Sequence, residues 1–207
     1  MTRTIATLLV AALAACAPVA PPPPSDVAAA VARPDIVAEL NAARTDPAGY
    51  ARKARALRGL LRGDRIERPG EIAVVTHEGA AAIDEAIAFL ERQPPLTAVA
   101  DSRPLTRAAA GHAADQAATG AAGHASADGS SPADRMRRQG RWSASGEAIA
   151  YGPDRAADVV LQLIVDDGVP DRGHRRILFN PAYTAVGAAC APHRVWGRVC
   201  VLDFARP

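Results

Sequence analysis

Aromatic residues, cysteines and long apolar runs are all scarce in this chain. Phenylalanine, tryptophan and tyrosine make up 4% of its 207 residues, only three cysteines are present, and the formal net charge is +2. The basic residues are spread along the chain rather than gathered in one patch, so we expect no nucleic-acid partner. No serine or cysteine adjoins a histidine in a recognisable nucleophile motif, which disfavours serine or cysteine hydrolase chemistry.

An apolar run near the N-terminus is too short to cross a bilayer as a stable helix and instead indicates export. It spans residues 5–15, follows the basic Arg3, and ends in Leu13-Ala14-Ala15-Cys16. These four residues resemble the lipobox of bacterial lipoproteins, in which the cysteine receives a diacylglycerol and becomes the first residue after cleavage. We therefore expect a signal peptide over residues 1–15 and lipidation at Cys16. The alternative is a plain secretory signal in which Cys16 is incidental.

The residues that follow predict where the folded part lies. Ala17, rather than aspartate, follows Cys16, and by resemblance to Gram-negative lipoproteins this indicates the outer membrane; a periplasmic or secreted protein is the alternative. An acyl chain contributes about 0.8 kcal/mol per buried methylene, so a lipidated Cys16 would hold the protein on a membrane. Residues 16–33 are rich in proline, with an unbroken run at 21–24, and predict a stiff tether. Residues 34–207 have the length of one domain.

The other two cysteines fall in an expected antiparallel hairpin near the C-terminus. Cys190 and Cys200 lie in apolar segments at 185–191 and 195–204, and a Pro-His-Arg turn at 192–194 separates them. Opposed residues of such a pair lie about 4.5 to 5.5 Å apart at Cα, which is within disulfide range. In an oxidising compartment we expect a Cys190–Cys200 disulfide, with two reduced core cysteines as the alternative.

Most of the domain before this hairpin has the apolar periodicity and the end signals of helices. Asp35 can begin the first helix, and Asp46-Pro47 ends it. Ser131-Pro132-Ala133-Asp134 has the residues of a capping box. The expected helices lie at 36–45, 48–61, around 83–90, at 104–119, 132–139 and 154–167, with a short strand or loop at 72–75.

Two histidines and several carboxylates form the densest group of chemically active side chains. His124 precedes Gly146-Glu147, and Asp166-Asp167 precedes Gly173-His174. Imidazole and carboxylate are ligands that Zn²⁺ accepts, and they also serve general acid and base catalysis. We therefore expect these side chains to share one cleft.

The order of these motifs resembles the CAP superfamily, which contains cysteine-rich secretory proteins, antigen 5 proteins, plant pathogenesis-related proteins and similar bacterial secreted proteins. His124 matches the first cleft histidine of the family. Gly146-Glu147-Ala148-Ile149 resembles its Gly-Glu-Asn-Ile motif, and Gly173-His174-Arg175 resembles the Gly-His-Arg of bacterial members. Leu40-Asn41-Ala42-Ala43-Arg44 looks like the opening helix. The resemblance covers residues 35–206 and is strongest from 103 onward.

This resemblance implies an α+β fold, a three-layer α-β-α sandwich with a central antiparallel sheet. It also implies a cleft of two histidines and two acidic residues, which binds Zn²⁺ or another divalent cation in some members. Ala148 stands where the family usually has asparagine, and the fourth ligand is an aspartate one methylene shorter than glutamate, so we expect any metal binding to be weak. Asp167 competes with Asp166 for the fourth place. The candidate metal ligands, carried over residue by residue, are His124, Glu147, Asp166 and His174.

Three functions are consistent with these residues. The first is an exported, membrane-anchored binding module whose cleft holds a divalent cation, a small apolar ligand or a lipid; family members bind sterols and fatty acids. The second is a metal-assisted hydrolase of the cell envelope, with Glu147 or His124 as general base. The third is a structural lipoprotein without catalytic activity. We favour the binding module, and an enzymatic role is the less favoured interpretation.

Overall fold

The computed structural model describes residues 35–207. The predicted signal peptide, the lipidation site Cys16 and the proline-rich tether lie outside these residues. Among the helices formed by residues 35–207, none combines the length and the apolar character needed to cross a membrane.

The first part of the domain is a group of helices with a small sheet at one end. α2 (Ile36–Thr45) begins after Asp35 and α3 (Pro47–Gly59) begins after Asp46, and each aspartate accepts a backbone N–H of the first turn that follows it. α3 packs against α4 (Ala80–Arg92). The small antiparallel sheet between α3 and α4 consists of β1 (Leu61–Arg62), β2 (Arg65–Ile66) and β3 (Val74–Val75).

The second part of the domain supplies the main sheet and the remaining helices. α5 (Arg103–Thr119) starts at the cap Ser102 and ends at Gly120, which adopts the left-handed conformation usual for glycine at this place. α6 (Pro132–Arg137) begins with a capping box in which both bonds form. The other elements are β4 (Ala100–Asp101), β5 (Ala144–Tyr151), α7 (Ala156–Val165), α8 (Gly173–Leu178), β6 (Ala185–His193) and β7 (Gly197–Arg206).

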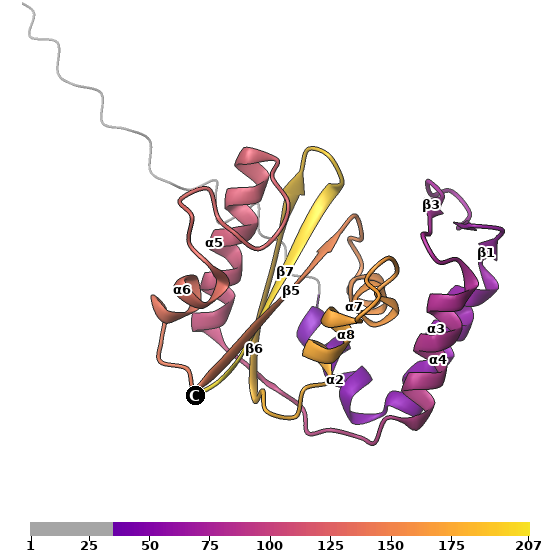
Figure 1. Ribbon diagram of the computed structural model, residues 1–207, viewed down its shortest axis with the longest axis horizontal. Helices are drawn as coiled ribbons and strands as arrows, with labels where there is room; N and C mark the ends of the chain where they lie inside the picture. The colour runs from indigo at the N-terminus through magenta and orange to yellow at the C-terminus, as the bar shows by residue number, and fades with distance from the viewer. Residues whose placement is uncertain (1–34) are drawn as a thin grey trace, which may run out of the picture.

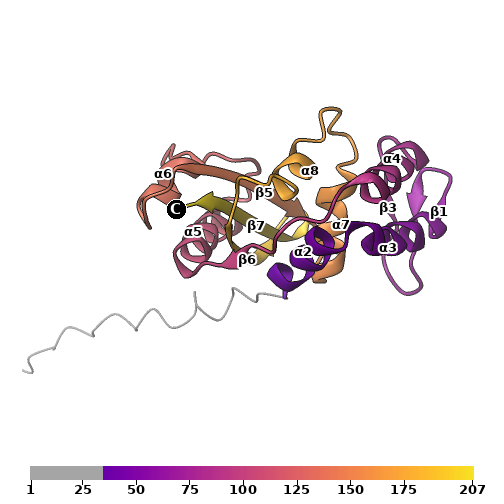
Figure 2. The same ribbon diagram turned by 90° about the horizontal axis from the view of Figure 1, so that it is seen from below.

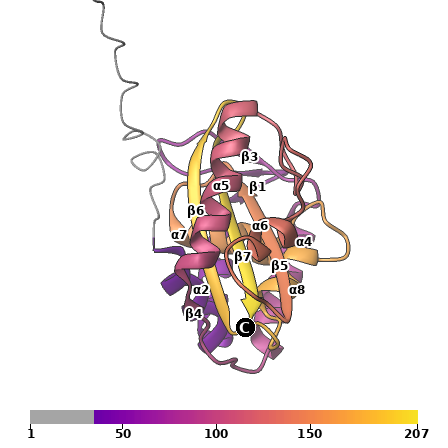
Figure 3. The ribbon, with the colours of Figure 1, turned by 90° about the vertical axis from the view of Figure 1, so that its left-hand side faces the viewer.

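The main sheet lies between two layers of helices. Its strands are ordered β4-β6-β7-β5; β5 and β6 each run antiparallel to β7, whereas the short β4 joins β6 in parallel. α5 and α6 cover one face, and α2, α7 and α8 cover the other, with α3, α4 and the small sheet beyond them (Figure 1; Figure 2). Figure 3 shows α5 lying across the face of the sheet. The predicted α-β-α sandwich is therefore confirmed, with a small parallel addition at one edge.

α5 approaches the sheet without an intervening side chain at Gly187 of β6. A Cβ atom at Gly187 would lie 2.0 Å from the backbone nitrogen of Thr106 and 2.3 Å from the carbonyl carbon of Leu105. Only glycine lacks this atom, so only glycine permits so close an approach. The helix backbone therefore rests directly on the strand.

Most of the predicted helices are present, and the differences concern their ends. α3 ends at Gly59 rather than at residue 61, because Leu61 joins β1. Asp154 does not begin α7: its N-cap residue is Arg155, whose side chain makes no capping bond. β1, β2, β4 and α8 were not predicted, because two-residue strands and a six-residue helix carry too little periodicity to recognise. The eight-residue β5 was not predicted either.

The C-terminal hairpin contains the predicted disulfide, but its turn lies further along the chain. Cys190 and Cys200 are directly opposed residues of β6 and β7, their Cα atoms lie 4.0 Å apart, and their sulfur atoms are bonded. β6 continues through Pro192 and His193, so the turn comprises residues 194–196 and not 192–194. Because β4 pairs only with the first two residues of β6, Pro192 lies where β6 has a partner on one side only, a position that tolerates the missing N–H.

Candidate functional site

His124 contacts a buried carboxylate on β5, an outer strand of the main sheet. Its Nδ1 atom lies 2.7 Å from Oε1 of Glu147, and the Glu147 side chain is 1% exposed while that of His124 is 51% exposed. Burial alone would raise the pKa of Glu147, but the hydrogen bond to His124 and the charge of Arg135 outweigh it, so the pKa lies below its ordinary value. Glu147 is therefore ionised and accepts the Nδ1 proton, which leaves the Nε2 lone pair of His124 for another partner.

His174 makes the same arrangement with Asp166. Its Nδ1 atom lies 2.7 Å from one carboxylate oxygen of Asp166, and its backbone N–H donates to the other oxygen at 2.9 Å. Asp166 ends α7 in the left-handed conformation, with φ 56°, and His174 lies in the first turn of α8. Because a carboxylate accepts the Nδ1 proton, Nε2 of His174 is also left for another partner.

Asp167 has a different role from its neighbour. Its two oxygens accept the backbone N–H groups of His77 at 2.6 Å and Glu78 at 2.8 Å, which attaches the loop before α4 to the end of α7. Of the two adjacent aspartates, Asp166 contacts the cleft histidine and Asp167 contacts that loop.

Arg172 fixes the turn that presents His174, and sequence reasoning did not identify it. It adopts φ 51° and donates to the carbonyl oxygens of Asp166 and Val169, both at 3.0 Å. Its guanidinium also pairs with Glu78 and Glu85, each at 2.6 Å. The hydrogen bond from Arg172 lowers the pKa of Glu78 to about 2. The only signal in the sequence was the position of Arg172 directly before Gly173-His174.

The two histidines meet across the edge of the sheet. Their ring centroids lie 6.5 Å apart and their planes are inclined by 36°. His124 comes from the loop between α5 and α6, whereas His174 comes from α8, which packs on β5. Within residues 35–207, no group of three or more His, Cys, Asp or Glu residues is arranged to hold a metal ion. The structure brings the four predicted residues together as two ring–carboxylate pairs, and their role as Zn²⁺ ligands stays a prediction.

Arg135 supports both Glu147 and the loop that carries His124. Its guanidinium donates to Oε2 of Glu147 at 2.5 Å, to the carbonyl oxygen of His124 at 2.9 Å and to that of Ser130 at 3.0 Å. The buried guanidinium of Arg135 therefore holds the loop that carries His124, and its positive charge balances that of the Glu147 carboxylate. Sequence reasoning missed this role, because the capping box directly before Arg135 indicates only the start of a short helix.

A second buried network attaches the same loop to α5. Nε2 of His112 lies 2.9 Å from the carbonyl oxygen of Gly123, and the amide of Gln116 donates to that oxygen at 2.7 Å. The N–H of Gly123 donates to the Tyr151 hydroxyl at 2.8 Å, which in turn donates to Gln116. His112 is fully buried, and burial lowers its pKa. It is a structural histidine that supports the cleft from behind.

Asp203 lies opposite Glu147 in the register of β7 and β5. It is fully buried, and neither of its side-chain oxygens has a hydrogen-bond partner within the described part of the chain. Burial, together with the negative charge of Glu147, raises the pKa of Asp203 well above its ordinary value. A protonated acid therefore adjoins the ionised Glu147. The signal for it in the sequence is a lone carboxylate inside an apolar strand.

Replacing Asp203 with asparagine should stabilise the protein at neutral pH by about 1 kcal/mol or more, because the neutral amide removes the cost of keeping a carboxyl protonated in the native state. A carboxyl whose pKa is raised in the native state contributes stability below its unfolded pKa and loses it as pH rises toward the native pKa. The gain should therefore be present at about pH 7 and absent at about pH 4. Urea unfolding of both proteins at these two values measures it, and a gain that does not vary with pH would contradict the assignment.

Ala148 shows what replaces the asparagine that is usual in the motif. It is fully buried on the face of β5 opposite to Glu147, where it packs in the main apolar core, and Leu202 is its partner on β7. An apolar contact therefore stands where the family usually has an amide.

The sandwich is an α+β domain that presents two oriented imidazoles at one edge of its sheet. The chain belongs to the CAP family, the cysteine-rich secretory protein family, which matches residues 38–204. No curated protein matches the chain.

Solved structures similar to the chain are distant in sequence. An extracellular protein containing an SCP domain from Bacillus anthracis is 21% identical with a TM-score of 0.47, and the match covers 59% of this chain and 37% of that one. An outer surface protein from Borrelia burgdorferi is 16% identical with a TM-score of 0.46, covering 54% and 79%. A cysteine-rich secretory protein from Staphylococcus aureus is 13% identical with a TM-score of 0.37, covering 54% and 33%. The chain thus spans about a third of the Bacillus and Staphylococcus proteins.

Proposed function

We propose that this protein is an exported CAP domain that binds a divalent cation through Nε2 of His124 and Nε2 of His174. Zn²⁺ is the cation that we propose before any other. The observation that supports this is the hydrogen bond from each Nδ1 to a buried carboxylate, Glu147 in one case and Asp166 in the other. Histidines that bind metals commonly donate their second ring N–H to a carboxylate, which fixes the tautomer and raises the basicity of the free nitrogen.

The two carboxylates then orient the rings, and the two imidazoles are the ligands. A site with only two protein ligands leaves the other positions to water, so we propose weak and exchangeable binding rather than a closed structural site. A bound cation would supply a positive charge that can polarise an oxygen atom of a ligand. His124, whose side chain is half exposed, provides access to the site from solvent.

The hydrolase interpretation gains less support from the cleft. A general base must be free to take a proton from the reacting group. Both oxygens of Glu147 are already engaged, one by His124 and the other by Arg135, and its pKa is lowered. These contacts favour a role for Glu147 in positioning His124. An apolar or lipid ligand is a further prediction from the family resemblance, and a structural lipoprotein without catalytic activity remains the other alternative.

Export and anchoring form part of the same proposal. The lipobox-like Leu13-Ala14-Ala15-Cys16 supports attachment of the protein to a membrane by a lipid on Cys16, most simply the outer membrane. The Cys190–Cys200 disulfide agrees with folding in an oxidising compartment. The family to which the chain belongs is itself named for secretion.

Calorimetric titration of Zn²⁺ into untagged protein tests the cation site. The wild type should release or absorb heat with a stoichiometry near one, and the double variant His124→Ala plus His174→Ala should give none above dilution, because both ligands are gone. The variant His77→Ala is the control, since it removes an exposed imidazole that is neither of the two proposed ligands, and it should bind Zn²⁺ as the wild type does. Equal heats for the wild type and the cleft variant would reject the proposal.

A further inference from the structure

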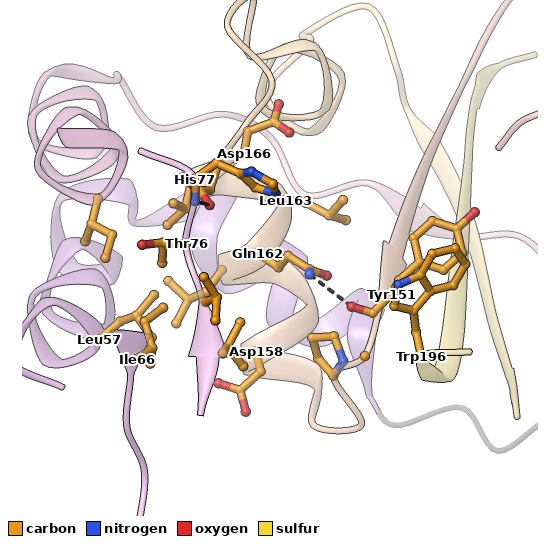
Figure 4. A pocket seen from close by; sticks show the side chains of 18 of the residues that line it. Leu57, Ile66, Thr76, His77, Tyr151, Asp158, Gln162, Leu163, Asp166 and Trp196 are labelled. Atoms are coloured by element: carbon orange, nitrogen blue, oxygen red, sulfur yellow. Dashed lines mark hydrogen bonds between the residues drawn. The ribbon is translucent and has the colours of Figure 1, made fainter. Parts of the chain in front are cut away.

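A groove of about 1060 Å³ lies beside the histidine cleft, between the small sheet, α7 and the end of β5. Asp166 and His77 line one part of it, and Tyr151 and Trp196 line another (Figure 4). His174 is also among the lining residues. The histidine pair therefore lies next to a much larger depression that the cation does not fill.

Exposed apolar side chains gather around this groove. Within the described part of the chain, the large exposed hydrophobic residues are Ile72, Val74, Val75, Val195 and Trp196. All of them except Val195 line the groove, and Ile72 is 94% exposed. Apolar surface gathered at one depression marks an interaction site, whereas single apolar residues scattered over a surface do not.

The groove also borders an outer strand. β3 pairs with β2 on one side only, and in Figure 1 it lies on the side of the small sheet nearer α7. Val74 and Val75 form this strand, and both line the groove. The backbone groups on the outer side of such a strand can pair with an added extended segment.

The charged side chains that line the groove indicate the charge of the ligand that it can bind. Five carboxylates line it against the two guanidinium groups of Arg68 and Arg155, and both guanidinium groups are paired with Asp158 at 2.7 and 2.6 Å. The lining therefore carries more acidic than basic side chains. The carboxylates are Glu71, Asp154, Asp158, Asp166 and Asp167.

We propose that this groove binds an extended peptide segment that carries apolar and basic side chains, added as a strand beside β3. Strand pairing supplies backbone hydrogen bonds, the apolar lining receives every second side chain, and the acidic lining attracts the basic ones. The charge disfavours anionic occupants, including fatty acids and acidic phospholipid headgroups. The proposal does not depend on the cation site, and it adds a second ligand beside it.

Fluorescence anisotropy with two labelled synthetic peptides tests this. Both have about ten residues, with valine at alternate positions; one carries lysine and the other carries glutamate between the valines. The lysine peptide should bind, and its affinity should fall as salt is raised; the glutamate peptide should not bind. Ile72→Ala plus Trp196→Ala should weaken the lysine peptide about tenfold or more, the scale of losing central apolar contacts.

Val195→Ala is the matched control, because Val195 is exposed next to Trp196 but does not line the groove; it should leave the affinity unchanged. Asp154→Lys, at an exposed lining residue, should weaken the lysine peptide and strengthen the glutamate peptide. Equal binding of both peptides, or a lysine-peptide affinity unaffected by the double variant, would overturn the proposal. Two other occupants of the groove are a lipid surface and a second copy of the chain. If the double variant abolished binding to phosphatidylcholine vesicles, or abolished a dimer in sedimentation, while its affinity for the lysine peptide stayed unchanged, the proposal would also be overturned.

Discussion

Asp166→Asn should lower the affinity of the protein for Zn²⁺ by about 10- to 100-fold, the usual cost of losing a partner behind a metal-binding histidine. The carboxylate of Asp166 holds Nδ1 of His174 at 2.7 Å and also accepts the backbone N–H of the same residue. An asparagine can turn its amide toward either group, so it orients the ring less strictly and no longer stabilises positive charge on it. Calorimetric titration at fixed pH measures the change.

The neighbouring residue supplies a matched control for this result. Asp167→Asn makes the same chemical change one residue later, at a carboxylate that contacts the N–H groups of His77 and Glu78 and no cleft histidine. It should leave the Zn²⁺ affinity within about twofold, which lies inside the spread seen for substitutions away from a site. Circular dichroism of both variants separates loss of the site from loss of the fold. If both variants bind Zn²⁺ as the wild type does, Asp166 has no part in the site.

Arg44→Ala should destabilise the protein by about 3 to 5 kcal/mol, the upper range for truncation of a large buried side chain. Arg44 is 1% exposed, and its guanidinium donates to the carbonyl oxygens of Leu178 at 2.5 Å, Asn180 at 3.3 Å and Thr97 at 3.3 Å. Truncation leaves a cavity between α2 and the segments that follow α8 and precede β4, and it removes the donor from each of these carbonyls.

Urea unfolding measures this loss, and two further variants locate its cause. Arg44→Met keeps most of the buried volume without the donors, so it should recover part of the lost stability. Arg52→Ala removes an exposed arginine from α3 and should change the stability by no more than about 0.5 kcal/mol. A loss below about 1 kcal/mol for Arg44→Ala would show that the three carbonyls find other partners.

Capping residues and apolar spacing were sufficient to predict the long helices. Asp35 and the capping box at Ser131 both act as the sequence indicates, because a cap is a local interaction of nearly adjacent residues. The disulfide was also predictable, since two cysteines in one hairpin have few other partners. The small sheet could not be predicted in the same way, because its pairs, such as Arg65 with Val75, depend on how two loops meet.

The candidate site shows the same division between local and distant contacts. Sequence reasoning selected His124, Glu147 and His174 from their motifs, and the structure brings them together, with the two histidine rings 6.5 Å apart. It could not identify Arg135 as the support of Glu147 and of the His124 loop, or Asp203 as the neighbour of Glu147, because these contacts join residues that are distant in the sequence. Asp203 stands out in the sequence only as a lone carboxylate in an apolar strand, and that pattern does not show that it lies opposite Glu147.

The bare contact at Gly187 has a consequence for how the cleft is preorganised. Since no side chain separates α5 from β6 there, the direct backbone contact restricts sliding and rotation of the helix against the strand. His112 and Gln116 extend from that helix to the carbonyl oxygen of Gly123, one residue before His124. The contacts through α5 therefore fix the position of the His124 ring relative to the sheet. That half of the site is ordered when the protein folds, so ligand binding does not have to supply the free energy of ordering it.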